Sequence, residues 1–179
     1  MVRFHDPCRV FQIVVMSKME PIQAARPLVL HAEDDPNDIA LMKHACLAAK
    51  VSFQLFPVND GEKAIQYLGG EGTFNDRSAY PSPSLLFLDL KMPRKGGFEV
   101  LQWIREHPSW KGLPVLILTS SRHEVDIKRG YELGANSYLV KPVNFEALVN
   151  MARLVDLYWM HLIQKPPFDV RVLAGTTGA

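Results

Sequence analysis

Five short strand-like segments alternate with segments of helical spacing, and this alternation is the strongest constraint on the fold of the chain. The strand-like segments span residues 28–32, 51–58, 84–88, 113–118 and 137–140. Four of the five are near-continuous apolar runs, which indicates strands that are covered on both faces. Strands that alternate with helices in this way predict a parallel sheet between two layers of helices.

Capping and turn residues set the expected limits of the helices. Pro36 fits the first turn of the first helix, because its missing N–H would have no helical partner there. Gly134 is a natural left-handed cap for the fourth helix, and Asn144 can cap the last one, from residue 145 to about 164. The polar residues 71–84 are predicted to form a long surface loop.

The two ends of the chain differ from this regular part. We expect residues 27–164 to form the domain and residues 165–179 to be a loose tail. Residues 1–26 are an extension whose structure stays open: a disordered arm, an extra strand or a mis-assigned translation start. The apolar run at residues 10–16 is too short for a membrane span and has no cleavage pattern after it, which favours a cytoplasmic protein.

Cysteine content and charge narrow the class of protein further. Cys8 and Cys46 cannot form a disulfide framework in a domain of this size, so a reducing compartment is expected. The formal net charge is +1 and the basic residues form no stripe, so no nucleic-acid partner is predicted.

Chemically active side chains follow four of the strand-like segments. Glu33-Asp34-Asp35 follow the first, Asp89 the third, Thr119 ends the fourth and Lys141 follows the fifth. The carboxyl ends of parallel strands open at the same edge of the sheet, so we expect these groups to converge. Clustered carboxylates repel one another, and Mg²⁺ relieves the repulsion with oxygen ligands. A carboxylate beside such an ion can take up a phosphoryl group as an acyl phosphate.

The residues around these positions resemble the signature of response regulator receiver domains. The resemblance covers residues 28 to about 160, and its motifs stand in the family's order at Glu33-Asp34, Leu88–Pro93, Thr119-Ser120 and Lys141-Pro142. It implies an α/β fold of the flavodoxin-like kind, a doubly wound (βα)5 three-layer sandwich with the parallel sheet order 2-1-3-4-5. The loop 71–84 and the turn 91–97 are similar to those of single-domain regulators linked to bacterial and cyanobacterial phytochrome kinases.

The resemblance implies a role for each site residue. Asp89 is the expected phosphoacceptor, Thr119 would bond the phosphoryl group, and Lys141 would pair with it. Mg²⁺ would be held by three side chains and one backbone carbonyl, those of Glu33, Asp34, Asp89 and, for the carbonyl, Lys91.

Two more positions carry expectations from the resemblance. Tyr138 matches an aromatic switch position that follows Thr119, although plain packing in a half-buried strand explains it equally well. Pro142 is expected to follow a cis peptide bond. The chain departs from many family members at Glu33 and Gly96, where Asp is common. We expect Lys91 and Ser121 to set how fast water attacks the acyl phosphate.

Simpler interpretations exist for several of these residues. Asp89 alone could cap a helix, and Lys141 alone could be a solvated surface lysine. Asp35 and Asp38 are predicted only to favour the positive end of the first helix. His31 and the other five histidines do not cluster at metal-ligand spacing and are interpreted as ordinary core or surface residues.

The last helix has more apolar residues than one buried stripe needs. The stripe toward the sheet is predicted to contain Leu148, Met151, Ala152, Val155 and Leu162. The remaining apolar side chains predict an interface, because large exposed patches usually mark one. We expect a homodimer through the face made by the fourth helix, the fifth strand and the fifth helix.

Three functions compete. The first is a stand-alone phosphorelay receiver that takes a phosphoryl group from a sensor histidine kinase and signals to an unknown protein partner. The second is an Mg²⁺ phosphatase of the haloacid-dehalogenase type, which needs a second acid two residues after the nucleophile, where this chain has Lys91. The third is a pseudo-receiver that is never phosphorylated. The resemblance favours the first, a signalling protein rather than an enzyme.

Overall fold

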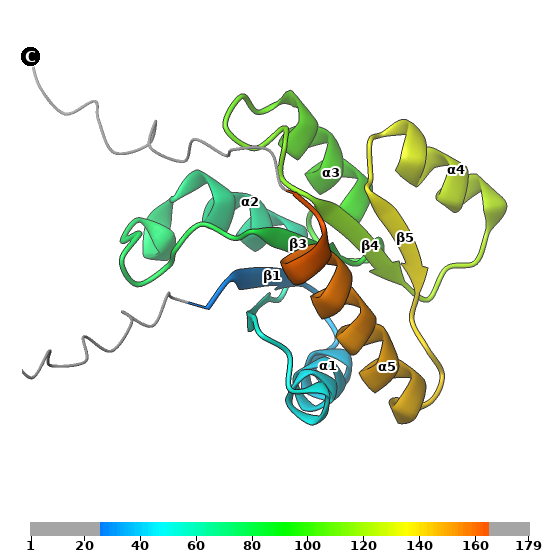
Figure 1. Ribbon diagram of the computed structural model, residues 1–179. Helices are drawn as coiled ribbons and strands as arrows, with labels where there is room; N and C mark the ends of the chain where they lie inside the picture. Colours follow the sequence, from blue (N-terminus) through cyan, green and yellow to red (C-terminus); the bar gives the residue numbers. More distant parts are fainter. Residues whose placement is uncertain (1–25, 165–179) are drawn as a thin grey trace, which may run out of the picture.

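The computed structural model describes residues 26–164, and these form a five-stranded parallel sheet between two layers of helices (Figure 1). The strand order is β2-β1-β3-β4-β5, as predicted, and all four neighbouring pairs are parallel. The strands are β1 (Leu28–Ala32), β2 (Gln54–Val58), β3 (Leu85–Leu88), β4 (Val115–Thr119) and β5 (Ser137–Val140). The helices are α1 (Pro36–Ala49), α2 (Gly61–Gly69), α3 (Gly97–Glu106), α4 (Glu124–Glu132) and α5 (Phe145–Val155), with a 3₁₀ turn η1 (Gly72–Phe74) and a π-helical turn η2 (Asp156–Leu162).

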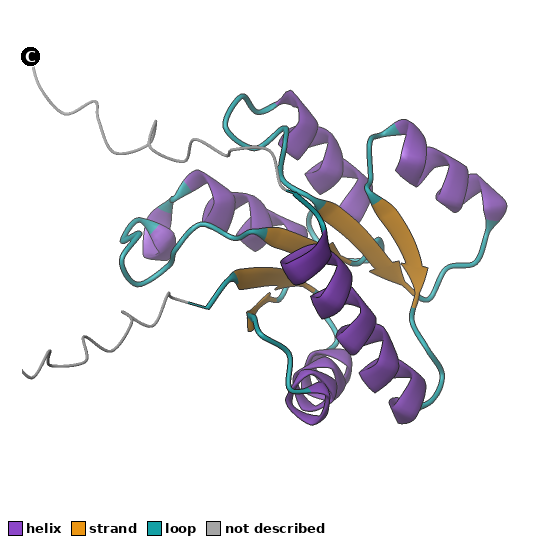
Figure 2. Ribbon diagram, in the orientation of Figure 1, coloured by secondary structure: helices purple, strands orange, loops and turns teal. Residues whose placement is uncertain are grey.

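Alternating side chains of the strands build two separate cores. Leu28, Leu30 and Ala32 of β1 face the layer that contains α2 and α3, whereas Val29 between them faces α1 and α5. Figure 2 shows α1 and α5 on one face of the sheet and α2, α3 and α4 on the other. All residues of β1, β3 and β4 are buried, as expected for strands with a covered surface on both sides.

The second strand is shorter than predicted. The structure begins β2 at Gln54, not at Val51, because Gln54 pairs with the first residue of β1, Leu28. Val51 and Phe53 therefore have no strand partner, yet they are buried in the core beside α1 and α5. Their apolar character reflects burial of a loop rather than pairing of a strand.

The polar segment 71–84 is only partly the surface loop that its composition predicts. Phe74 in η1 is buried and packs against the ring of Tyr67 in α2. The Tyr67 hydroxyl donates a hydrogen bond of 2.9 Å to the carbonyl of Pro81. The Arg77 guanidinium donates to the carbonyls of Tyr67 and Leu68, which lie in the last turn of α2. The loop is thus fixed to the core at several points.

The last helix reaches Leu162, close to its predicted end, but its backbone becomes π-helical at Asp156. Leu148, Ala152 and Val155 are buried and Met151 is half-buried, as predicted. Leu162 is the exception, since 62% of it is exposed. A π-helical turn holds more residues than an α-helical turn and so rotates the following side chains. Trp159 therefore packs against the core in place of Leu162.

Some expectations concern residues that the structure does not describe. The extension 1–25, the tail 165–179 and Cys8 lie outside the described residues. Cys46 is a buried free cysteine in α1, as predicted. Within residues 26–164, no helix is both long and apolar enough to cross a membrane.

Candidate functional site

The carboxyl ends of β1, β3, β4 and β5 are tied together by backbone hydrogen bonds that continue the sheet. The Asp89 amide donates to the carbonyl of Ala32 at 3.0 Å, and the Lys141 amide donates to the carbonyl of Thr119 at 2.9 Å. These bonds place the residues at the carboxyl ends of the four strands side by side at one edge of the sheet. The sequence prediction that these groups converge is confirmed for Glu33 and Asp89, whose carboxylates lie 2.6 and 3.7 Å from the Lys141 ammonium.

Three of the predicted metal ligands form a compact group of oxygen donors. One carboxylate oxygen from each of Glu33, Asp34 and Asp89 lies within 4.8 Å of the other two. Glu33 and Asp89 are buried, whereas Asp34 is exposed at the mouth of the group. Buried carboxylates this close repel one another, and a hard divalent cation with oxygen ligands fits such a set.

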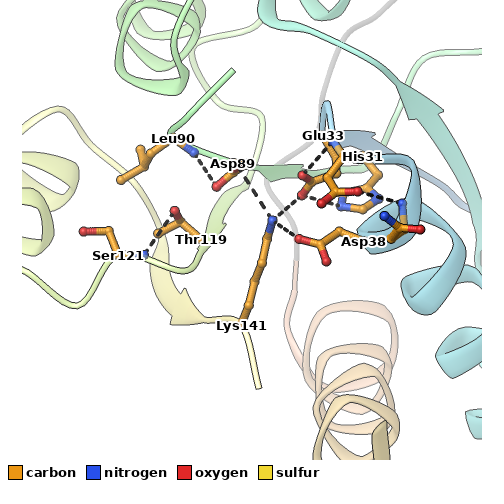
Figure 3. A network of polar contacts seen from close by, with 10 residues as sticks. His31, Glu33, Asp38, Asp89, Leu90, Thr119, Ser121 and Lys141 are labelled. Carbon is orange, nitrogen blue, oxygen red and sulfur yellow. Dashed lines mark hydrogen bonds and ion pairs between the residues drawn. The ribbon is translucent and has the colours of Figure 1, made fainter. Parts of the chain in front are cut away.

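The Lys141 ammonium lies among these acids (Figure 3). Its Nζ atom is 2.6 Å from Oε2 of Glu33, 2.7 Å from Oδ2 of Asp38 and 3.7 Å from Oδ2 of Asp89. Burial by itself would lower the pKa of Lys141, but the hydrogen bonds to Asp38 and Glu33 raise it. Lys141 therefore stays charged. These four residues are called the Lys141 cluster below.

The ionised form of Glu33 is disfavoured in the Lys141 cluster. Burial raises its pKa to about 7, and the repulsion from Asp89 adds to this, while Lys141 opposes it. One ammonium thus does not compensate the carboxylates around it. This excess of negative charge, beside the oxygen donors of Glu33, Asp34 and Asp89, fits a site that binds a divalent cation.

Asp38 is a member of the site that the sequence did not reveal. Its position in the first turn of α1 suggested only a favourable contact with the helix end. The structure instead joins it to Lys141, which is 103 residues away in the sequence. Asp35 behaves as predicted, since its side chain accepts a hydrogen bond of 2.8 Å from the Asn37 amide and caps α1.

His31, interpreted from the sequence as an ordinary residue, is buried beneath the cluster. Its Nε2 atom is 3.9 Å from Oε2 of Glu33. Burial, together with the charges of Lys141 and Lys43, lowers the pKa of His31 to about 3. The imidazole is therefore neutral at physiological pH and adds no positive charge to the cluster.

The Asp89 carboxylate has one restrained oxygen and one that faces the cation side of the pocket. Oδ1 accepts a hydrogen bond of 2.8 Å from the amide of Leu90, whereas Oδ2 is the oxygen nearest Lys141. Gly97 allows the backbone of the following loop to pass close by, because a Cβ atom there would lie 2.2 Å from the Asp89 carbonyl oxygen.

Thr119, Ser121 and Tyr138 form a chain of contacts beside Asp89. The Ser121 amide lies 3.4 Å from Oγ1 of Thr119, which is buried at the end of β4. The Tyr138 hydroxyl donates to the Ser121 carbonyl at 3.2 Å. The Ser121 hydroxyl donates to Oδ2 of Asp126 at 2.5 Å, so it is directed at α4 and away from Asp89 (Figure 3). Any effect of Ser121 on hydrolysis would then act through the loop.

The loops that follow β3 and β5 contain Lys91 and Pro142, two residues for which the sequence carried expectations. The side chain of Lys91, in the loop after Asp89, is exposed. The peptide bond before Pro142 is trans, since the described residues contain no cis peptide bond, so the expectation of a cis bond was wrong. Even for proline the trans form is the more stable one, and a motif alone does not reverse that preference.

An ion pair that was not predicted joins the loop after Asp89 to α2. Arg94 has a left-handed backbone (φ 65°) and its guanidinium pairs with the carboxylate of Asp60. Asp60 is fully buried and also caps α2, accepting a hydrogen bond of 2.7 Å from the Lys63 amide. Neither residue belongs to a sequence motif that signals this contact.

Comparison with known proteins identifies the family. Residues 29–153 match the family described as the response regulator receiver domain. Response regulator Rcp1 of Synechocystis sp. is 32% identical over 139 residues, which are 78% of this chain and 92% of that protein.

Two solved structures extend the comparison. The crystal structure of the Mn²⁺-bound form of response regulator Rcp1 has a TM-score of 0.70 at 32% identity and covers 79% of this chain and 99% of that chain. The crystal structure of the phosphorylated cyanobacterial phytochrome response regulator RcpA has a TM-score of 0.73 at 32% identity. The match covers 80% of this chain and 100% of that chain. On the family match, the relatives and the shared fold, this chain belongs to the response regulator receiver domains of two-component signalling.

Proposed function

We propose that this receiver accepts a phosphoryl group on Asp89 and holds Mg²⁺ with Glu33, Asp34, Asp89 and the backbone carbonyl of Lys91. The observation that carries the proposal is the Lys141 cluster, in which one ammonium faces more carboxylates than it can compensate. Oxygen donors alone favour a hard divalent cation. The Mn²⁺-bound form of Rcp1 supports a divalent ion at such a site, and we propose that the ion in this protein is Mg²⁺.

The orientation of Asp89 supports its role as the nucleophile. Its Oδ1 is held by the Leu90 amide, so Oδ2 is the oxygen left to form the new bond to phosphorus. As that bond forms, the bond between phosphorus and the donor breaks, and the leaving group keeps the electron pair. Bound Mg²⁺ would offset negative charge in the pocket and on the phosphoryl oxygens. Lys141, 3.7 Å from Oδ2, is placed to pair with a phosphoryl oxygen.

The response to phosphorylation is proposed to pass through Thr119, Ser121 and Tyr138. A phosphoryl group on Asp89 would offer the Thr119 hydroxyl a charged oxygen as hydrogen-bond acceptor. Movement of Thr119 would shift the Ser121 amide beside it, and with it the carbonyl that Tyr138 bonds. Phosphorylation would thereby favour a second arrangement of the loop before α4, a shift between two states.

A sensor histidine kinase is the proposed phosphoryl donor, of the phytochrome-linked kind, with a further protein partner downstream. The relationship to a phosphorylated phytochrome response regulator supports this choice. We also propose that the protein is cytoplasmic and binds no nucleic acid. The phosphatase alternative is disfavoured because Lys91 stands where that class needs a second acid.

We further propose a homodimer through α4, β5 and α5. Leu154, Leu157 and Tyr158 are about half to two-thirds exposed on the last helix. Beside them, a groove of about 420 Å³ is lined by apolar side chains such as Leu139 and Met151. Burial of such a patch favours association. Light scattering with and without a phosphoryl mimic tests this, and a strict monomer in both conditions would remove the proposal.

The phosphoacceptor is tested by intact mass. The protein is incubated with Mg²⁺ and acetyl phosphate, and we expect the mass to increase by one base-labile phosphoryl group. Asp89→Asn should abolish this gain. Asp76→Asn, at an exposed position of the segment 71–84, is the control with the same charge change and should behave as wild type. A base-labile phosphoryl group that persists in Asp89→Asn would place the acceptor elsewhere.

A further inference from the structure

Asp38 makes a contact that helix stabilisation does not explain. Asp35 already caps α1, and among the described residues the Asp38 carboxylate has its hydrogen bond with Lys141 alone. The Asp38 side chain is 35% exposed and that of Lys141 is 16% exposed, so the pair lies at the edge of the pocket. A carboxylate in this place therefore acts on the lysine as well as on the end of the helix.

The ammonium of Lys141 lies on the side of the pocket away from Thr119. Its two short contacts, 2.6 Å to Glu33 and 2.7 Å to Asp38, come from β1 and α1, whereas Asp89 is 3.7 Å away. In Figure 3, Asp38 and Thr119 lie on opposite sides of the Lys141 side chain. A phosphoryl group on Asp89 would therefore compete for an ammonium that Glu33 and Asp38 already hold.

Two effects of Asp38 on a bound phosphoryl group have opposite signs. It orients Lys141, which favours binding, and it competes for the ammonium and repels the added negative charge, which oppose binding. Glu33 holds Lys141 at 2.6 Å from a buried position and supplies the orientation without Asp38. Removal of the Asp38 charge therefore leaves Lys141 oriented but lessens the competition and the repulsion, so these two effects decide the sign.

We propose that Asp38 is a positioning residue that retains Lys141 in the unphosphorylated state and weakens the hold of the pocket on a phosphoryl group. The inference rests on the proposed function of Asp89 and adds a residue that limits it. Asp38 acts through Lys141 and does not itself touch the phosphoryl group.

The test compares Asp38→Asn with Asp35→Asn. Both variants remove one negative charge from the start of α1, and Asn at residue 35 can still cap the helix. The affinity for beryllofluoride, a phosphoryl mimic, is measured in Mg²⁺ by calorimetry. Asp38→Asn should bind it about threefold more tightly, the size typical of one partly exposed ion pair. Asp35→Asn should stay within experimental scatter of wild type, and Asp38→Glu, which keeps the charge, should restore wild-type affinity.

A second measurement needs neither metal nor phosphoryl mimic. The ¹⁵N signal of the Lys141 ammonium in metal-free protein should shift in Asp38→Asn and stay in place in Asp35→Asn. Thermal unfolding of each variant checks that the fold is retained.

The outcomes separate this inference from the proposed function. If wild-type protein binds beryllofluoride but Asp38→Asn matches Asp35→Asn, or binds more weakly, the inference is wrong and the function of Asp89 stands. If wild type shows no binding that depends on Asp89, the proposed function is wrong. An unchanged Lys141 signal in Asp38→Asn would overturn the inference by itself.

Discussion

Two acids at the same edge of the sheet are equally buried, yet their pKa values move in opposite directions. Glu33 is 1% exposed and its pKa rises to about 7, whereas Asp60 is fully buried and its pKa falls below the ordinary value. Burial raises both. At Asp60 this is outweighed by hydrogen bonds from Arg94 and from the Lys63 amide. At Glu33 the one cation, Lys141, is shared with Asp38 and Asp89.

The difference shows that local charge balance, not burial, separates the two roles. The Asp60–Arg94 pair is satisfied by the protein alone, and it fixes the loop after β3 to α2. The Lys141 cluster is not satisfied by the protein alone, which leaves it able to respond to a metal ion and a phosphoryl group. Excess charge of one sign at a buried site is a mark of function.

The largest expected difference appears when the cation of the Lys141 cluster and the cation of the Asp60–Arg94 pair are each replaced by Met. Lys141→Met should slow phosphorylation by acetyl phosphate about 100-fold, the usual cost of losing one charged contact to a reacting group. Arg94→Met should leave the rate nearly unchanged, because its guanidinium contacts Asp60 and Glu62 and none of the Lys141 cluster. Time courses of intact mass measure both rates. Equal losses in the two variants would refute the division into a functional and a structural group.

For folding stability, we expect the Asp60–Arg94 pair to matter more than the Lys141 cluster. Asp60→Ala removes the cap of α2 and the partner of Arg94, and we expect the free energy of unfolding to fall by about 2 kcal/mol. Asp60→Asn keeps the cap and should lose less. Urea denaturation gives these values. Glu33→Gln in metal-free protein at pH 8 is the contrasting variant, and it should not be destabilised, because its ionised carboxylate is unfavourable there. A loss as large as that of Asp60→Ala would contradict the comparison.

Mg²⁺ binding should depend on pH through Glu33. A ligand with a pKa of about 7 must lose its proton before it binds the ion, so affinity should increase as the pH rises. Between pH 6 and pH 8 we expect a rise of about tenfold, since the ionised fraction changes by that factor around such a pKa. Calorimetry in buffers of different ionisation enthalpy would detect the released proton. Glu33→Gln should bind Mg²⁺ more weakly and lose the pH step, and a step that persists there would assign it to another group.

The smallest expected effect is the loss of folding stability that Asp60 provides when the pH is lowered. The folded-state pKa of Asp60 lies below its unfolded value, so its contribution to stability is present at neutral pH and is lost as the pH falls through the lowered pKa. The difference in unfolding free energy between wild type and Asp60→Asn should therefore narrow as the pH is lowered below the ordinary range for Asp. Denaturation at several pH values measures this. A difference that does not change with pH would show that the Asp60 charge is irrelevant.

The strand ends were predictable from the sequence because each reactive residue follows an apolar run directly. Asp89 comes immediately after the buried strand β3, Thr119 ends the buried strand β4, and Lys141 follows the half-buried strand β5, so a parallel sheet brings them to one edge. Local order along the chain was enough for this, since neighbouring parallel strands start and stop together.

The partners of these residues were not predictable in the same way. The contact of Asp38 with Lys141 depends on how α1 lies beside the end of β5, and the pairing of Arg94 with Asp60 depends on a left-handed backbone at residue 94. The π-helical turn is similar. Asp156, where it begins, accepts hydrogen bonds of 3.0 and 2.6 Å from Ser52, far away in the sequence.

The sequence by itself determined the number of strands, their parallel direction and the residues that stand at their carboxyl ends, because period and spacing are local properties of the chain. The tertiary structure alone decided which acids share Lys141, which acid is neutralised by Arg94, and which apolar side chains of the last helix stay exposed. These depend on distances of a few ångströms between segments far apart in sequence, and electrostatic energy changes steeply over such distances.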